Sequence, residues 1–410
     1  MKSIINFIVV LLFAFVSCNN RGNTESQNGE LLKTIHLNLS GANTDSINLS
    51  FIAKKVEYIP LQTDNGILLN DFGNLTITDK YFFLNMGGST FEYDNEGKFI
   101  RNLYKTGRGP GEVFARSYSV DRIGKRVYVY SNYEHVIKEY DFGGKFIKTI
   151  RNQINDPTHW TKEVFFFNNS LVSVTYQNQE SKYLLSSFDL STEKNRILYK
   201  DFSHDSTSKI NPRLIQPIDA INYQLFDSVF LFKEMFCDTI FKVTNTFNIK
   251  PKYIVDFGNR RIKREDLLKY NLGDRAKPYG YRINSFAETN SFLFLLLGSF
   301  IDDIVFVIQN KRDNSTKMIL DRISKFAYSN AYFKNDLDGI VDFNPLNSQG
   351  KFIYYNECLY SIVDAKRFNK AYQSASNKSK NSSEYLIKMA PAFKSIDEFS
   401  NQIIMKVYLK

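Results

Sequence analysis

The stretch YDNEGKFIRNL at residues 93–103 decides the fold, because it returns as YDFGGKFIKTI at residues 140–150. The two copies lie 47 residues apart. Each reads as the end of one strand, a tight turn that contains glycine, and the start of a second strand, which is the pattern of a β-hairpin. A hairpin that recurs at the length of one blade predicts a β-propeller.

The composition of the 410-residue chain agrees with a fold made of strands. Aromatic residues make up 15% of the chain, with 36 Phe and 25 Tyr, and aromatic and β-branched residues favour sheets over helices. A propeller of this length is one closed unit, so the length does not require a second domain. We therefore predict an all-β, six-bladed β-propeller with four-stranded blades and short helical insertions over residues 34–410.

Four strands can be placed in each of the first five blades. The strands of blades one and two are expected at 75–78, 81–84, 91–94 and 98–103, and at 118–121, 126–130, 136–141 and 145–150. Those of blades three and four are expected at 164–167, 171–176, 183–189 and 195–199, and at 218–222, 228–232, 239–243 and 252–257. Those of blade five are expected at 283–288, 292–298, 304–309 and 318–322. Blade three repeats the turn Asp at position 189 but lacks the turn glycine.

Blade six has three expected strands of its own, at 339–343, 351–356 and 359–364. We expect the strand at 56–61, from the other end of the chain, to supply the fourth, because such closure removes the exposed edges of the first and last blades. The strand at 403–409 would add to the same seam. Further elements are a strand at 34–39 and helices at 260–268 and 384–389, the latter ending before Pro391.

The first 17 residues predict an export signal. A short charged region at Lys2 precedes an apolar run at 4–16 that is too short to span a membrane. Cys18 and a polar run follow, as in bacterial lipoprotein signals that are cleaved before a lipid-bearing Cys. The alternative is an ordinary secretory peptide that contains a cysteine. With lipid on Cys18, residues 18–33 form a flexible tether of an outer-membrane lipoprotein that faces the periplasm or the cell surface.

The charge pattern and the cysteine content bear on three questions: nucleic-acid binding, disulfides and metal sites. The formal net charge is +10, but Lys and Arg are scattered along strands, whereas a nucleic-acid-binding surface needs a clustered basic stripe. We therefore expect no nucleic-acid partner. Besides Cys18, the chain has Cys237 and Cys358, which are either buried thiols or a disulfide formed in an oxidising compartment. No CxxC, HExxH or paired-His spacing is present, so neither a metal nor a cofactor is predicted.

Several segments, taken in order, resemble a known family. Three are similar to NHL-type propeller repeats: GKFIR at 97–101, KTGRGPGEVF at 105–114 and VYVY at 127–130. Three more extend the similarity: VEYIPL at 56–61, CDTIF at 237–241 and NDLDG at 335–339. Together they resemble the six-bladed β-propeller lipoprotein family of unknown function from gut-type Gram-negative bacteria, over residues 34–410. The resemblance implies the fold and an anchored location, and it assigns no catalytic residue.

Propeller topology places a candidate binding surface on one face, which we call the mouth. The crossovers into the innermost strands and the loops between the second and third strands of each blade lie on this face. It gathers charged and aromatic side chains from blades two and three: Lys105, Arg108, Arg116, Tyr133, Glu134, His135, His159 and Trp160. Trp160 beside His and Arg would stack on a sugar ring or help to hold an acidic group. The alternative is that Trp160 packs beneath its own loop.

The glycine-rich segment GRGPG at 107–111 has a phosphate-binding alternative, because successive glycines can turn backbone N–H groups toward an anion. It lacks the P-loop pattern and a following helix, and Pro110 removes one N–H group. A crossover between blades that needs glycine for positive φ is the favoured interpretation.

Two functions from different classes remain open. The export signal, the fold and the lack of a catalytic motif favour a lipid-anchored, monomeric propeller that binds a glycan, peptide or partner protein without catalysis. The alternative is a carbohydrate-active hydrolase or lyase that uses carboxylates or a Tyr/His pair at the mouth. Adjacent carboxylates such as Asp302 and Asp303 point to opposite faces of a strand and cannot share one reacting centre. Convergence of two carboxylates at the axis would favour the enzyme.

Overall fold

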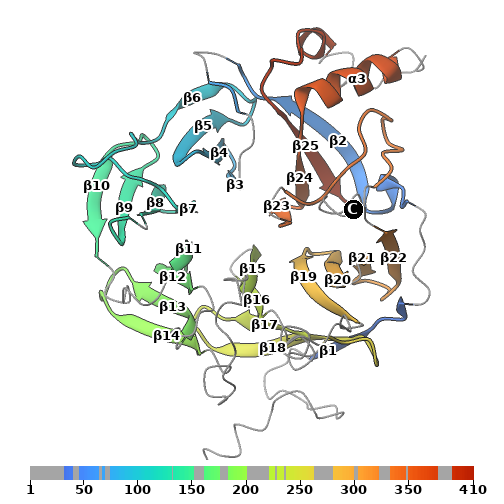
Figure 1. Cartoon of the computed structure of the whole chain (residues 1–410), viewed down its shortest axis with the longest axis horizontal. Coiled ribbons are helices and arrows are strands. Elements are labelled where there is room, and N and C mark those ends of the chain that lie inside the picture. Colours follow the sequence, from blue (N-terminus) through green and yellow to red (C-terminus); the bar gives the residue numbers. More distant parts are fainter. Residues whose placement is uncertain are drawn as a thin grey trace, which may run out of the picture.

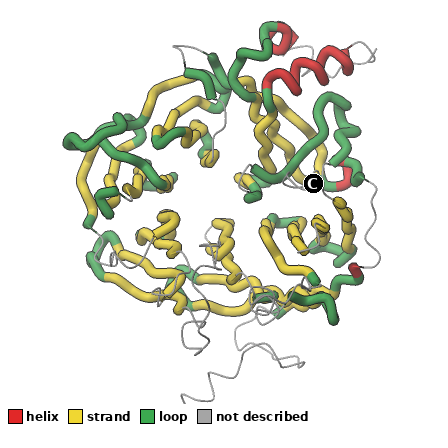
Figure 2. Tube along the Cα trace, in the orientation of Figure 1, coloured by secondary structure: helices red, strands yellow, loops and turns green. Residues whose placement is uncertain are grey.

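The chain forms a closed ring of six sheets around one axis in the computed structural model (Figure 1). The structure describes residues 32–39, 46–63, 67–69, 74–131, 133–151, 161–175, 183–200, 221–226, 229–234, 237–262, 280–299, 303–322, 333–347, 350–376 and 390–410. Figure 2 shows that strands build the ring, whereas helices lie at its outer rim. The predicted all-β, six-bladed propeller is therefore confirmed.

Blades one to three each contain four antiparallel strands that follow one another in the chain. Blade one consists of β3 (Asn74–Ile77), β4 (Tyr81–Met86), β5 (Ser89–Asp94) and β6 (Phe99–Asn102). Blade two consists of β7 (Ser117–Asp121), β8 (Arg126–Ser131), β9 (Val136–Asp141) and β10 (Phe146–Ile150). Blade three consists of β11 (Thr161–Phe167), β12 (Ser170–Thr175), β13 (Tyr183–Asp189) and β14 (Asn195–Lys200). The predicted strands of these blades are confirmed, with small shifts at their ends.

Blades four and five repeat this order. Blade four contains β15 (Ile221–Phe226), β16 (Val229–Glu234), β17 (Thr239–Val243) and β18 (Ile249–Asp256). Blade five contains β19 (Tyr281–Glu288), β20 (Phe292–Ser299), β21 (Asp303–Asn310) and β22 (Thr316–Arg322). The predicted strands overlap these, although residues 218–220 of the first lie outside the described residues.

The repeated hairpins have one physical cause. In blade one, Asp94 Oδ1 accepts hydrogen bonds from the backbone N–H groups of Glu96 and Lys98, at 3.0 and 2.8 Å, and Gly97 has φ of +87°. Such a side chain fixes the turn, and glycine adopts positive φ without steric cost. In blade three, Glu193 takes the position of the missing glycine at φ +53°, while Asp189 again caps the turn. In blade two, Asp141 Oδ1 likewise accepts the Lys145 N–H at 2.9 Å, so the Asp, rather than the glycine, is the constant feature of these three turns.

Blade four has a fifth strand, β1 (Lys33–His36), which was predicted from the sequence without a partner. It pairs in parallel with β18, so that Lys33 lies opposite Tyr253 and His36 opposite Asp256. Strand β18 runs from the turn at 244–248 toward the mouth. Because β1 is parallel to it, β1 begins on the side of that turn, which is the face opposite the mouth.

Both ends of the chain close blade six. From the axis outward, its strands are β23 (Ile353–Tyr355), β24 (Cys358–Val363), β25 (Ile403–Leu409) and β2 (Ala53–Pro60). The N-terminal strand is the outermost, as predicted, and the C-terminal strand forms the third position of the same blade. This arrangement, visible as adjacent blue and red arrows in Figure 1, buries Val56 against Val407.

The predicted strand at 339–343 is wrong. Asn335 Nδ2 donates hydrogen bonds to Asp338 Oδ1 at 2.7 Å and to the Val341 carbonyl at 3.0 Å, and Gly339 has φ of +71°. Short polar side chains that bond to nearby backbone compete with a strand ladder. The segment is therefore a loop, and it packs against blade six because Tyr58 Oη donates to Asp338 Oδ1 at 3.1 Å.

The main helix, α3 (Ala365–Ser376), was not predicted. Its Phe368 ring lies 5.1 Å from the Tyr58 ring, so α3 covers the outer strands of blade six. A one-turn 3₁₀ helix, η2 (Leu49–Phe51), precedes β2, and a short helix spans 390–394. The helix predicted at 384–389, and residues 263–268 of the one predicted at 260–268, lie outside the described residues. Among the helices that are described, none has the length and apolarity needed to cross a bilayer.

The two cysteines within the propeller, Cys237 and Cys358, do not form a disulfide. Cys358 is buried and Cys237 is half-buried. The structure thus agrees with the thiol alternative rather than with a disulfide between them.

Candidate binding site at the propeller axis

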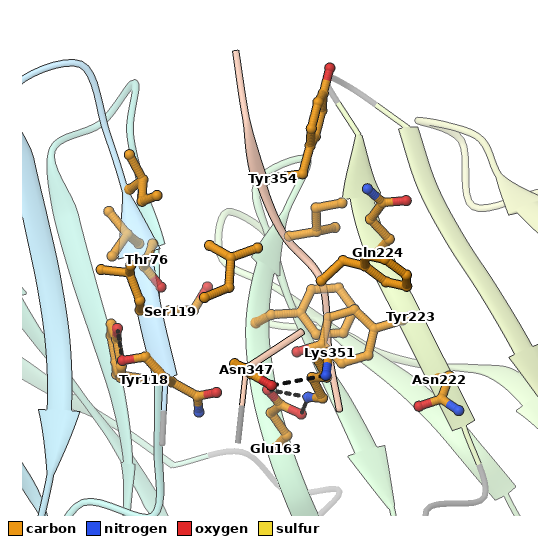
Figure 3. Close-up of a pocket in the computed structure, with 18 of the residues that line it drawn as sticks. Thr76, Tyr118, Ser119, Glu163, Asn222, Tyr223, Gln224, Asn347, Lys351 and Tyr354 are labelled. Atoms are coloured by element: carbon orange, nitrogen blue, oxygen red, sulfur yellow. Dashed lines mark hydrogen bonds and ion pairs between the residues drawn. The ribbon is translucent and has the colours of Figure 1, made fainter. Parts of the chain in front are cut away.

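The first strands of all six blades surround a cavity of about 190 Å³, which we call the axial cavity. Strands β3, β7, β11, β15 and β19, together with the segment that leads into β23, contribute its wall (Figure 3). All six first strands run in the same direction, from the mouth to the opposite face. Residues at the start of these strands therefore lie near the mouth, and residues at their ends lie near the other opening.

Near the mouth, blades three, four and six meet in an ion pair. Lys351 Nζ donates to Glu163 Oε2 at 2.9 Å and lies 5.1 Å from the centre of the Tyr223 ring (Figure 3). The Tyr223 hydroxyl also donates a hydrogen bond to Glu163. Burial alone would raise the pKa of Glu163, but the Lys351 charge and these hydrogen bonds lower it overall. Burial, reinforced by the Glu163 charge, raises the pKa of Tyr223, so near neutral pH Glu163 is a carboxylate and Tyr223 a neutral phenol.

Local irregularities aim the two charged side chains at the axis. The pairing of β11 with β12 shifts between Thr161 and Glu163, which marks a β-bulge at the start of β11. Bulges commonly redirect a side chain beside a site. Lys351 follows a loop that Asn347 closes, because Asn347 Oδ1 accepts the Lys351 N–H at 2.8 Å. Both side chains are thus positioned by interactions that do not require a ligand.

Between its two ends, the wall is polar and held between blades. Ser119 Oγ accepts the Phe166 N–H at 2.7 Å, and Asn222 Nδ2 donates to the Asn284 carbonyl. Gln224 Nε2 donates to the Glu288 carbonyl at 3.2 Å. Each of these bonds joins neighbouring blades, so the amide and hydroxyl groups of the wall have fixed positions. Fixed polar groups in a small cavity are the usual basis of ligand specificity.

The end opposite the mouth carries an arginine. Arg122 follows the last residue of β7, and its Nε donates to the Ile77 carbonyl at 2.9 Å. Its guanidinium lies 4.6 Å from the centre of the Tyr355 ring, and Tyr355 Oη donates to Asp79 Oδ1 at 2.8 Å. The side chain as a whole is exposed, but its guanidinium is crowded by protein, and this burial lowers the pKa of Arg122.

Two of the predicted mouth residues contact each other. The guanidinium of Arg108 lies 4.6 Å from the centre of the Tyr133 ring and donates a hydrogen bond to the Tyr133 hydroxyl. The ring of Phe114 lies 6.1 Å from that of Tyr133, and both rings are exposed. The crossover into blade two and the β8–β9 loop therefore meet on the mouth, as topology predicts.

The other predicted mouth residues have local structural partners or lie outside the described residues. Glu134 lies 2.9 Å from Lys138 Nζ, and His135 adopts φ of +52° in the same turn. The backbone of Lys105 forms a bridge with Glu112, and the Arg116 N–H donates to the Tyr130 carbonyl at 2.8 Å. His159 and Trp160 lie outside the described residues. None of the six described residues lines the axial cavity.

In the glycine-rich crossover at 107–111, the backbone already binds the carboxylate of the neighbouring Glu112. Glu112 Oε2 accepts the Gly109 N–H at 2.9 Å, and a Cβ on Gly107 would lie 2.2 Å from the same oxygen. Gly111 has φ of +75°. The segment thus has the geometry of the predicted crossover, with its anion-facing N–H group directed at Glu112. Within the described ranges, no group of three or more His, Cys, Asp or Glu side chains is placed to hold a metal ion.

The residues that line the cavity were missed for local reasons. Glu163 lies one residue before the predicted first strand of blade three, and Tyr223 one residue after that of blade four. A usable signal exists, since the first strands of blades one to five carry polar residues among apolar ones, such as Thr76 in β3 and Ser119 in β7.

Comparison with known proteins identifies the family. Residues 32–408 match the domain of unknown function DUF4934. The chain belongs to the DUF4934 family. This agrees with the predicted resemblance to a six-bladed propeller family of unknown function, whereas the NHL-like repeats and the lipid anchor remain predictions.

One solved structure shares the fold, and a second has weaker similarity. A Bacteroides fragilis protein assigned as exported superposes with a TM-score of 0.63 at 16% identity, covering 92% of this chain and 99% of its own. A DUF4221 member from Bacteroides vulgatus gives a TM-score of 0.48 at 10% identity, covering 87% and 97%. Among curated proteins, no sequence matches the chain.

Proposed function

We propose that this DUF4934 protein is a lipid-anchored binding module of the cell envelope, which holds one unit of a polar ligand in the axial cavity. The observation that carries the proposal is the cavity wall, which six blades build from an ion pair, a tyrosine and fixed amide and hydroxyl groups. Such a wall suits the hydroxyl-rich surface of a glycan better than an apolar peptide side chain. The exposed Arg108, Phe114 and Tyr133 would contact the rest of the ligand at the mouth.

The anchored location rests on the predicted export signal at residues 1–17 and on Cys18 as the predicted lipid acceptor. The structurally similar Bacteroides fragilis protein, which is assigned as exported, supports the same compartment. Strand β1 begins on the face opposite the mouth, so a tether that leads from Cys18 to Lys33 would reach the propeller from that face. The mouth would then point away from the membrane, toward an incoming ligand. We expect the anchored protein to act as a monomer, on the outer membrane and without nucleic acid.

The hydrolase alternative has less support. Glycosidases use two carboxylates roughly 5–10 Å apart, one of which donates or accepts a proton. Among the described residues that line the cavity, the one carboxylate is Glu163, and Lys351 and Tyr223 already bind it. Its lowered pKa keeps Glu163 ionised, which is the wrong state for a general acid. Binding without cleavage is therefore the better-supported function.

A cavity-filling variant tests the proposal. Leu225 lines the cavity and is partly exposed, so L225W would fill the space with an indole ring. I147W is the matched control, because Ile147 is 41% exposed on β10, the outermost strand of blade two. The purified propeller is first screened against mono- and oligosaccharides and short peptides by saturation-transfer NMR, and hits are then titrated calorimetrically.

The expected result is that hits bind the wild type and I147W equally and bind L225W at least tenfold more weakly. A panel without any binder, or equal binding by L225W, would refute the axial site. Mass spectrometry of the same mixtures gives a separate readout, because shortened products would favour the hydrolase or lyase over the binding module.

A further inference from the structure

We infer that the axial cavity binds an acidic sugar, and that Arg122 holds its carboxylate at the end opposite the mouth. This inference rests on the proposed binding function and specifies its ligand class. It follows from the charge balance of the wall, from the unused donors of Arg122 and from the size of the cavity.

The charges of the cavity wall do not cancel. Three described lining residues are charged, namely Glu163, Lys351 and Arg122. Glu163 and Lys351 neutralise each other at 2.9 Å. No carboxylate of the described residues lies within 4.0 Å of Arg122; the charge of Asp79 acts on it from beyond that distance, and Asp79 accepts the Tyr355 hydroxyl. A cationic group in a partly enclosed cavity attracts an anion, and the net charge of +10 adds to that attraction.

The guanidinium of Arg122 is held in place but not saturated. Its Nε is used by the Ile77 carbonyl, and its face stacks over Tyr355, which together fix the plane of the group. Its two terminal nitrogens make no hydrogen bond to any residue that the structure describes. A planar, oriented guanidinium with free donors matches the two oxygens of a carboxylate. Burial lowers the pKa of Arg122, and the charge of the nearby Asp79 opposes this shift only in part.

The cavity size and the remaining wall favour a sugar acid over a larger anion. A cavity of about 150 Å³ accommodates benzene, so the 190 Å³ here has room for about one six-membered ring. The wall offers amide and hydroxyl partners for ring hydroxyls, including Asn222 and Gln224. One ring with a carboxylate at Arg122 and hydroxyls along the wall uses each of these groups.

The experiment compares acids with matched neutral compounds on the full propeller. The probes are D-glucuronate and D-galacturonate against D-glucose and D-galactose, N-acetylalanine against its amide, and inorganic phosphate. The variants are R122Q, R122K and K125Q. Lys125 lies in the same turn as Arg122, is exposed and does not line the cavity. K125Q is therefore the control that removes one positive charge outside the proposed site. Circular dichroism melts verify that each variant is folded.

We expect a uronate to bind the wild type and K125Q alike, to bind R122Q at least tenfold more weakly, and to show partial recovery with R122K. Neutral sugars should bind at least tenfold more weakly than their acids. Equal binding of glucose and glucuronate, preference for N-acetylalanine or phosphate, or unchanged affinity of R122Q would each overturn the inference. If neutral sugars bind and L225W blocks them, the binding function stands while the carboxylate inference fails. If no probe binds, both fail.

Discussion

Glu288 is the buried charge whose removal should destabilise this propeller most clearly. It is the last residue of β19 in blade five and is 1% exposed. Its carboxylate lies 2.8 Å from Lys252 Nζ and 2.6 Å from Lys311 Nζ, and it accepts the Tyr253 hydroxyl at 2.8 Å. Lys252 and Tyr253 belong to β18, so this carboxylate connects blades four and five. The substitution E288Q keeps the shape of the side chain and removes its charge.

The magnitude follows from the burial of the partners. Removing one member of a buried ion pair costs about 3–5 kcal/mol, because the other member keeps an uncompensated charge. The side chains of Lys252 and Lys311 are 15% and 25% exposed, so water partly solvates their charges. The expected loss of unfolding free energy is therefore near the lower end of this range, at about 3 kcal/mol. For a urea m-value of about 3 kcal/mol/M, the unfolding midpoint should fall by about 1 M.

The assay is urea unfolding at several pH values. Burial would raise the pKa of Glu288, but the charges and hydrogen bonds of Lys252 and Lys311 lower it overall. A lowered carboxyl pKa stabilises the fold above the ordinary value of 4.5, and this contribution disappears as pH falls through the native value. The difference in urea unfolding midpoint between the wild type and E288Q should therefore be largest at pH 7 and should decrease below pH 4.5.

A matched control uses the same substitution at an exposed pair. Glu398 lies 3.2 Å from Lys366, and their side chains are 53% and 74% exposed. Exposed pairs contribute about 0–1 kcal/mol, so E398Q should leave the midpoint nearly unchanged. Equal midpoints for E288Q and E398Q at pH 7, or a gap that widens in acid, would refute the account of Glu288.

Two further predictions concern blade one. Burial raises the pKa of Glu92 to about 7, although Arg101 Nε lies 3.1 Å away. The contribution of Glu92 to native stability should therefore be lost as pH rises from 4.5 through 7. The variant E92Q should have a higher Tm than the wild type at pH 8 but not at pH 5. An increase in the Tm of E92Q that is the same at pH 5 and at pH 8 would contradict this prediction. G97A should cost about 3 kcal/mol or more, because φ is +87° and a Cβ would lie 2.2 Å from the Pro60 carbonyl oxygen. G258A is the control at φ +62° with no atom within 4 Å, and it should cost only about 1 kcal/mol in the same denaturation assay.

The parts of this fold that could be predicted are those specified by local sequence. The Asp-capped hairpins follow from five or six consecutive residues, and they appear where the sequence places them even where Glu193 replaces glycine. Blade six was predicted less well, because side-chain hydrogen bonds of Asn335 turn an expected strand into a loop. Helix α3 was missed although the sequence carries its signal, because Ala365, Phe368 and Tyr372 recur at spacings of three and four residues and form its buried face.

The candidate site could not be predicted from the sequence, because it depends on contacts between distant segments. Glu163 and Lys351 are 188 residues apart and belong to blades three and six, so their ion pair forms only once the ring has closed. Closure itself depends on β2 and β25, which lie at opposite ends of the chain. The cavity that we propose as a ligand site is thus a property of the whole ring. It follows that a substitution that weakens the β2–β25 seam, far from the axis, should weaken ligand binding along with stability, because the position of Lys351 depends on blade six remaining in the ring.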